Sequence, residues 1–217
     1  MTAVVFALLI SFPLSKLAFI LPRHLDPSLG SEPTSGHRNL RALFVLLTLS
    51  SAAVCAWRFG ATTASLAAMG FSACLLTLAW IDAETGFLPD ALTLPLLWTG
   101  LLVNINGTFA SLADAVIGAA AGYLSLWLLN AAFFAFTRRQ GMGRGDFKLL
   151  AALGAWLGWT SLPWLLLVAS VLALIVAFAR RLAGRLQAGE SFSFGPYLAL
   201  TGIAALINLT PPIMPFF

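Results

Sequence analysis

The sequence predicts an all-α fold, a polytopic membrane helix bundle with about eight transmembrane helices. Of its 217 residues, 60% are hydrophobic and only 9% are charged, whereas roughly 25% are charged in a typical soluble domain. The mean hydropathy is +0.94. A soluble fold cannot bury this much apolar surface, so lipid must surround most of the chain. In lipid, backbone polar groups have to be satisfied within each segment, which favours helices.

Apolar runs along the chain define the expected spans. A helix needs about 20 mostly apolar residues to cross a bilayer, with a range of about 17–25. Runs that fit or approach this length lie at roughly 3–21, 42–57, 60–81, 91–106, 115–136, 147–160, 162–179 and 194–210. The second, fourth and sixth are short, which a bundle accommodates by local thinning of the bilayer or by packing them inside. We divide the chain into residues 1–41, a first span with a short loop, and residues 42–217, the main transmembrane bundle.

Lysine and arginine are distributed unevenly between the loops. With eight spans, the loops at 22–41, 82–90, 137–148 and 180–193 fall on one side of the membrane. They hold Arg23, Arg38, Arg41, Arg138, Arg139, Arg144, Lys148, Arg180, Arg181 and Arg185, whereas the opposite side receives Arg58. Because cytoplasmic loops carry the excess of basic residues, we expect these four loops in the cytoplasm and both termini outside it.

Acidic residues near lipid call for an explanation, because an aspartate at a helix centre costs some 2.5–3.5 kcal/mol on insertion scales. Asp90 precedes the span at 91–106 and is expected to cap its N-terminus. Asp82 has no comparable structural role. It ends a long apolar helix, where the helix dipole disfavours an anion. A cation, a water molecule or a proton must therefore compensate its charge.

A second acid, Asp146, follows three glycines at alternate positions, Gly141, Gly143 and Gly145. Glycine permits backbone angles closed to other residues and the close approach of another chain. The spacing fits neither a dinucleotide fingerprint nor a P-loop. Two interpretations stay open: a flexible connector with Asp146 as the N-cap of a helix, or a glycine-lined approach that lets a substrate backbone reach Asp146.

Asp82 and Asp146 both stand at the cytoplasmic ends of spans that can pack side by side. Two carboxylates in one site hold one proton between them. This is the chemistry of aspartic proteases, in which one carboxylate activates water and the other protonates or polarises the peptide carbonyl. It needs no metal. Two cysteines and two histidines provide no recognisable metal site, and the basic residues are too dispersed to bind nucleic acid.

The segments around both aspartates resemble those of the type IV prepilin peptidases, bacterial membrane aspartic peptidases with a Gly-x-Gly-Asp signature. The resemblance covers roughly residues 75–207. It rests on Ile81-Asp82, Leu88-Pro89-Asp90, Leu92-Thr93-Leu94-Pro95, Gly100-Leu101, Asn104, Gly141-Met142-Gly143-Arg144-Gly145-Asp146, Lys148-Leu149-Leu150-Ala151-Ala152-Leu153-Gly154-Ala155 and Phe194-Gly195-Pro196-Tyr197-Leu198-Ala199.

The resemblance implies roles for five residues. Asp82 and Asp146 would be the catalytic pair of an aspartic endopeptidase. Gly143 and Gly145 would give a substrate backbone its approach. Lys148 matches the motif lysine and would have a positioning or charge-balancing role, with a plain interfacial anchor as the alternative.

The resemblance also implies a substrate and a location. The substrate would be a prepilin or pseudopilin of a type IV pilus or type II secretion system, a precursor with a basic leader followed by an apolar helix. The leader would be removed at the cytoplasmic face of the bacterial inner membrane, with membrane lipid as the surroundings and no nucleic-acid partner. Asp90 and Glu84 fall within the first motif, but family members often carry another residue in place of Asp90, so neither is assigned a catalytic role.

The N-terminal part departs from the family pattern. Full-length members carry a larger cytoplasmic insert between the first two spans, often with two Cys-x-x-Cys pairs that bind zinc, whereas the loop from about 22 to 41 has no cysteine. In the family this region is linked to N-methylation with S-adenosylmethionine. We therefore expect a shortened N-terminal region, peptidase activity alone and no cofactor. S-adenosylmethionine would be required only if methyl transfer is retained.

Three other hypotheses fit parts of the sequence. A transporter could use Asp82 and Asp146 as proton or cation sites, although both lie at helix ends and not at the midplane. A non-catalytic homologue could act in pilus or secretion assembly. A serine–lysine peptidase could use Ser15 and Lys16, but neighbouring residues on a helix point about 100° apart. Proton flux in vesicles would favour the transporter, and leader cleavage the peptidase.

Overall fold

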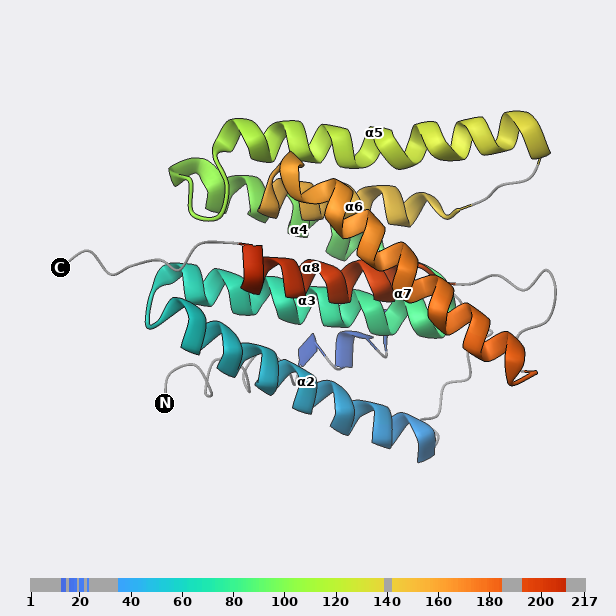
Figure 1. Cartoon of the computed structure of the whole chain (residues 1–217). Helices are drawn as coiled ribbons and strands as arrows, with labels where there is room; N and C mark the ends of the chain where they lie inside the picture. The colour runs from blue at the N-terminus through green and yellow to red at the C-terminus, as the bar shows by residue number, and fades with distance from the viewer. Residues whose placement is uncertain are drawn as a thin grey trace.

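The computed structural model is all-α, as the composition and the apolar runs predict. It describes residues 13–14, 16–18, 20–21, 23, 35–138, 142–184 and 193–209, and these contain no strand. The helices are α2 (Ser35–Phe59), α3 (Thr63–Thr85), α4 (Asp90–Val103), η1 (Asn104–Asn106), α5 (Leu112–Thr137), α6 (Arg144–Leu157), η2 (Trp159–Ser161), α7 (Leu162–Leu182) and α8 (Gly195–Leu209). Figure 1 shows α3 and α8 side by side, with α2 beyond α3, and with α4 and α6 between this pair and α5.

Within the described residues, four helical segments are long and apolar enough to cross a membrane, as expected of an integral membrane protein. They are Ala42–Phe59, Thr63–Thr85, Leu112–Thr137 and Trp159–Leu182. α8 is a shorter apolar helix, and α4 and α6 have 14 residues each. Fourteen residues rise about 21 Å, less than the roughly 30 Å of a hydrocarbon core. The number of eight spans therefore stays a prediction, and the first of them, 3–21, lies largely outside the described residues.

Two predicted boundaries near the acidic residues are wrong. α3 continues to Thr85, so Asp82 lies within its last turn instead of at its end. α4 begins with Asp90 itself, and the residue in the capping position is Pro89, which makes no side-chain capping bond. Asp90 is therefore not the N-cap that the sequence predicts, and its carboxylate is available for another partner.

The short helix α6 lies at the centre of the bundle. Every residue from Leu149 to Leu157 is buried, and α6 packs most extensively against α5 and then against α4. The approach to α5 requires glycine: a Cβ on Gly118 would lie 2.4 Å from the carbonyl oxygen of Gly154, and a Cβ on Gly122 would lie 2.6 Å from that of Leu150. Small residues four apart are a usual means of close helix packing in membranes. The neighbouring helices thus enclose α6 along most of its length.

Asn104 ties the end of α4 to the end of α6. Its side chain is fully buried; Nδ2 donates to the carbonyl oxygens of Ala155 and Trp156, each at 2.9 Å, and Oδ1 accepts from the backbone N–H groups of Phe109 and Ala110 at 2.9 and 3.1 Å. The two carbonyls belong to the last turn of α6, whose carbonyl groups lack partners within the helix. All hydrogen-bonding positions of the amide are therefore used.

Replacing Asn104 with leucine should destabilise the protein by about 3 kcal/mol, because buried carbonyl and amide groups lose their partners at a site where water cannot replace them. Thermal unfolding in detergent, followed by circular dichroism, measures the change. The matched control is Asn106→Leu, which alters an exposed asparagine of the same 3₁₀ turn. An equal shift of the midpoint in both variants would contradict the structural role of Asn104.

Candidate active site

Asp82 is held at the junction of α3 and α8. Its side chain is only 4% exposed, and its Oδ2 accepts a hydrogen bond from the backbone N–H of Gly195 at 3.0 Å. Gly195 is the first residue of α8, so the positive end of that helix dipole faces the carboxylate. This N-terminus supplies the compensation that an anion in the last turn of α3 requires, and nothing in the sequence around Asp82 indicates it.

Asp146 lies in the first turn of α6 and is 7% exposed. The N-cap of α6 is Gly143, so the alternative of Asp146 as the N-cap is wrong. Gly143 has φ −70° and ψ 145°. Other residues adopt these angles readily, so the backbone conformation does not require a glycine at this position. A Cβ at Gly143 would lie 3.7 Å from Asp146 Oδ2, so this residue covers one side of the carboxylate.

Gly145 brings the two acidic segments together. A Cβ at this position would lie 2.7 Å from the Cβ of Leu88, a buried residue in the connection between α3 and α4. Gly145 therefore permits a close approach by the chain's own Leu88, and the approach of a substrate backbone along Gly143 and Gly145 stays a prediction. Any larger side chain at Gly145 would push the segment after Asp82 away from the start of α6.

Asp82 and Asp146 line one cavity of about 210 Å³. The cavity lies between the C-terminal end of α3, the start of α4 and the start of α6. The structure thus brings all five residues singled out in the sequence to one place. The lining residues are Asp82, Gly86, Phe87, Leu88, Asp90, Gly143, Arg144, Gly145, Asp146 and Lys148; Gly141 lies outside the described residues.

Burial, followed by the nearby Asp82 carboxylate, raises the pKa of Asp146 from its ordinary 3.8 to about 7. Asp146 lies outside the four segments long enough to cross the membrane. An acid with this pKa keeps its proton near neutrality beside a second carboxylate. Such a pair can supply both a proton donor and a proton acceptor to one substrate bond.

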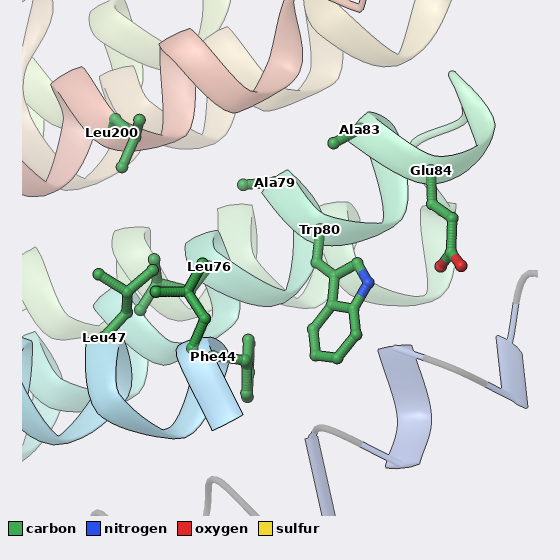
Figure 2. A pocket seen from close by; sticks show the side chains of 9 residues that line it. Phe44, Leu47, Leu76, Ala79, Trp80, Ala83, Glu84 and Leu200 are labelled. Carbon is green, nitrogen blue, oxygen red and sulfur yellow. The ribbon is translucent and has the colours of Figure 1, made fainter. Parts of the chain in front are cut away.

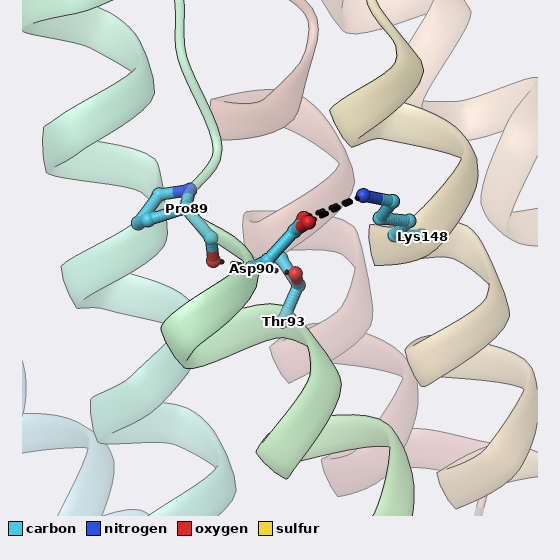
Figure 3. Close-up of polar contacts among 4 residues, drawn as sticks. All are labelled: Pro89, Asp90, Thr93 and Lys148. Carbon is cyan, nitrogen blue, oxygen red and sulfur yellow. Dashed lines mark hydrogen bonds and ion pairs between the residues drawn. The ribbon is translucent and has the colours of Figure 1, made fainter. Parts of the chain in front are cut away.

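Lys148 forms an ion pair with Asp90 at the edge of this cavity. Its Nζ donates to the two carboxylate oxygens of Asp90 at 2.6 and 2.7 Å (Figure 3). Figure 3 also shows Thr93, whose Oγ1 donates to the carbonyl oxygen of Pro89 at 3.2 Å and so fixes the first turn of α4. The sequence indicates neither Asp90 as the partner of Lys148 nor Gly195 as the partner of Asp82.

A second cavity, of about 420 Å³, lies between α2, α3 and α8 (Figure 2). Its walls are mainly apolar and include Phe44, Trp80 and Leu200. Of the described residues that line it, Glu84 alone is charged, and this carboxylate accepts from Arg23 at 3.3 Å. Neither Asp82 nor Asp146 lines it, so it offers no acid–base pair. Within the described parts of the chain, no three His, Cys, Asp or Glu side chains are grouped to hold a metal ion.

Comparison with known proteins identifies relatives of this chain. The type IV leader peptidase family matches residues 69–178. The prepilin leader peptidase/N-methyltransferase of Burkholderia pseudomallei (strain 1026b) is 51% identical over 173 residues, 78% of this chain and 56% of that protein. The proteins with the same name from Neisseria gonorrhoeae and Pectobacterium carotovorum subsp. carotovorum are 47% and 55% identical over 74% and 61% of this chain. The chain spans about half the length of these curated relatives. No solved structure matches it.

The family match covers half of the chain and contains both acidic segments that form the cavity. Asp82 and Asp146 both fall within residues 69–178, as do the central helix α6 and the ion pair between Asp90 and Lys148. The chain therefore belongs to the type IV leader peptidase family.

Proposed function

We propose that this protein is a membrane aspartic endopeptidase that removes the basic leader peptide of type IV prepilins or pseudopilins. One observation carries the proposal: Asp82 and Asp146, which come from separate sequence motifs, are both buried and line the same cavity. The names of the relatives support the substrate class. The Gly145–Leu88 contact and the Asp90–Lys148 ion pair support a fixed spacing between the two carboxylates.

In the proposed reaction, Asp82 is ionised and Asp146 carries the proton. The Gly195 N–H stabilises the charge on Asp82, and the raised pKa of Asp146 favours its protonated form. Asp82 removes a proton from a water molecule, whose oxygen bonds to the scissile carbonyl carbon, while Asp146 donates its proton to the carbonyl oxygen. When the C–N bond breaks, the proton on Asp82 passes to the leaving amine and Asp146 regains its own from the hydroxyl group.

The active site is proposed to face the cytoplasm from the bacterial inner membrane. The start of α2 and the ends of α5 and α7 lie at one end of the bundle (Figure 1), and Arg138, Arg180 and Arg181 occupy the ends of the latter two helices. Asp82 and Asp146 lie at the same end, since the C-terminus of α3 and the N-termini of α6 and α8 meet there. An excess of arginine marks the cytoplasmic side of membrane proteins.

The test uses the full chain, purified in detergent or in liposomes, with a synthetic prepilin that carries its basic leader. Mass spectrometry follows leader removal, with and without S-adenosylmethionine. We expect a single cut that releases the leader and no methyl gain on the mature peptide. Failure of the folded protein to cut several different prepilins would contradict the peptidase. Proton flux in vesicles without cleavage would favour a transporter. Absence of both activities would favour a non-catalytic role in assembly.

Leader removal should slow as the pH rises above about 7. Asp146 keeps its proton up to about pH 7, so a proton donor is present there. Above it, the rate at saturating substrate should fall about tenfold for each pH unit. The folded protein keeps a proton on Asp146 up to about pH 7, whereas the unfolded chain releases it near pH 4. The free energy of unfolding should therefore decrease as the pH rises from about 4 to 7. Initial rates across the pH range measure the first effect, and a rate that keeps rising above pH 8 would contradict it.

A further inference from the structure

The ion pair between Asp90 and Lys148 joins the two segments that carry the aspartates. Lys148 follows Asp146 by two positions on α6, and Asp90 is the first residue of α4, after the connection from Asp82. Both oxygens of Asp90 accept from the same ammonium group, at 2.6 and 2.7 Å. Both residues also line the cavity that Asp82 and Asp146 share. The pair therefore bridges the edge of the cavity from one motif to the other.

The exposure of this pair limits what it can contribute to stability. The Lys148 side chain is 29% exposed and that of Asp90 is 55% exposed. Ion pairs with this access to solvent contribute little to folding. The bidentate geometry instead fixes the position of a charge, because lysine has a flexible four-carbon stem and its ammonium group is otherwise free to move.

A mobile ammonium group beside the two aspartates would interfere with a shared proton. A cation that approaches a carboxylate favours its ionised form. If Asp82 and Asp146 were both ionised, neither could donate a proton to the substrate carbonyl. Since Lys148 lines the same cavity as both acids, what holds its ammonium group matters for the proposed reaction.

We propose that Asp90 is a positioning residue, which holds the Lys148 ammonium group at the edge of the cavity so that a nearly neutral ion pair, and not a free cation, stands beside Asp82 and Asp146. This inference rests on the proposed peptidase function of the site. It assigns Asp90 a role through Lys148, without contact with the substrate.

Among the described residues, the elements at this end of the bundle carry other charged and titratable groups, none of which is changed together with Asp90 or Lys148. They include Arg23, which precedes α2, Asp82 and Glu84 on α3, Arg144 on α6 itself, Tyr123 and Arg138 on α5, Arg180 on α7, and Tyr197 on α8. Arg144 lines the cavity, and Glu84 pairs with Arg23. A change that follows from Asp90 or Lys148 can therefore be assigned to that pair.

The experiment measures kcat against pH for the full chain and for Asp90→Asn, Lys148→Met and the double variant. Asp90→Asn leaves the ammonium group without its partner, which lowers the pKa of Asp146 and should move the alkaline limb down by about one pH unit. Lys148→Met leaves the Asp90 carboxylate unpaired, which raises that pKa and should move the limb up by about one unit. The double variant removes both charges, so its limb should return close to that of the wild type.

The matched control is Glu84→Gln, which removes the carboxylate of a different ion pair, that between Arg23 and Glu84. Glu84 lies near Asp82 in the sequence but outside their cavity, so its limb should move much less than that of Asp90→Asn. Shifts in the same direction for both single variants, no shift, no compensation in the double variant, or an equal shift in Glu84→Gln would each overturn the proposal. Thermal unfolding of every variant separates these outcomes from loss of fold.

An infrared titration of the protonated carboxyl band provides a readout that needs no substrate, with Asp146→Asn to assign the band. The same opposite shifts are expected there. If the wild-type protein cleaves no prepilin, the proposed function fails, but the infrared titration still decides whether Asp90 and Lys148 set the protonation of Asp146. Opposite and compensating shifts support the inference, and unshifted bands overturn it.

Discussion

Replacing either Asp82 or Asp146 with asparagine should reduce leader removal by about a thousandfold or more while the protein stays folded. Each variant keeps the size of the side chain but removes either the group that accepts a proton from water or the group that donates one. General acid–base groups typically raise the reaction rate 10²–10⁴-fold. When two groups act as a unit, removal of either one already removes most of their joint effect. The double variant should therefore be little slower than either single variant.

Retention of the fold is expected for a physical reason. Asp146 has its pKa raised to about 7 by burial and by Asp82, so below neutrality asparagine replaces a carboxyl group that is mostly uncharged at this position. For Asp82, asparagine keeps an oxygen that can accept the hydrogen bond from the Gly195 N–H. Mass spectrometry of the cleaved prepilin and thermal unfolding in detergent measure the two properties. The control is Glu84→Gln, which changes a carboxylate two positions from Asp82 but outside the cavity. Substantial cleavage by either aspartate variant would remove that residue from the proposed mechanism.

Replacing Gly195 with alanine should lower kcat by about a hundredfold with a much smaller effect on stability. A Cβ at this position would lie 2.7 Å from Asp82 Oδ2 and 3.0 Å from its Cγ. Because Asp82 is buried, its carboxylate has to move, and it loses the hydrogen bond from the Gly195 N–H. A displacement of about 1 Å at a reacting group costs on the order of 10²-fold in rate.

Gly70→Ala is the matched control for this variant. Gly70 lies within α3, the helix that carries Asp82, and a Cβ there would meet no atom within 4 Å. Alanine is a better helix former than glycine by about 1 kcal/mol, so this variant should be at least as stable as the wild type and equally active. Full activity of Gly195→Ala would show that the N-terminus of α8 does not position Asp82.

The sequence predicted the class of fold because class depends on composition and on local runs. Apolar segments of spanning length and few charges require helices in lipid wherever the chain folds. It predicted the ends of the helices less well. The last turn of α3 continues past Asp82 to Thr85, where the Gly195 N–H of α8 offsets the unfavourable charge. Asp90 begins α4 without being its N-cap.

The glycines of the Gly-x-Gly-Asp segment also have surroundings that the sequence did not indicate. The sequence indicated unusual backbone angles and a close approach by a substrate. Gly143 has ordinary angles, and Gly145 packs against Leu88 of the chain itself. A glycine pattern shows that space is needed, but it does not show which atoms fill that space, since the neighbour comes from a distant part of the sequence.

By itself, the sequence determined that this protein is an all-α membrane protein, and it singled out Asp82 and Asp146 as the candidate acids, with an N-cap role still open for Asp146. Both conclusions follow from residues close together in the chain. Only the tertiary structure decided what stands beside them. The Gly195 N–H on Asp82 and the Asp90 carboxylate on Lys148 join residues 113 and 58 positions apart. Every residue except proline has a backbone N–H, so the sequence does not show which N–H will bond a distant carboxylate. The partner of an exposed aspartate such as Asp90 is likewise set only by the packing of α4 against α6.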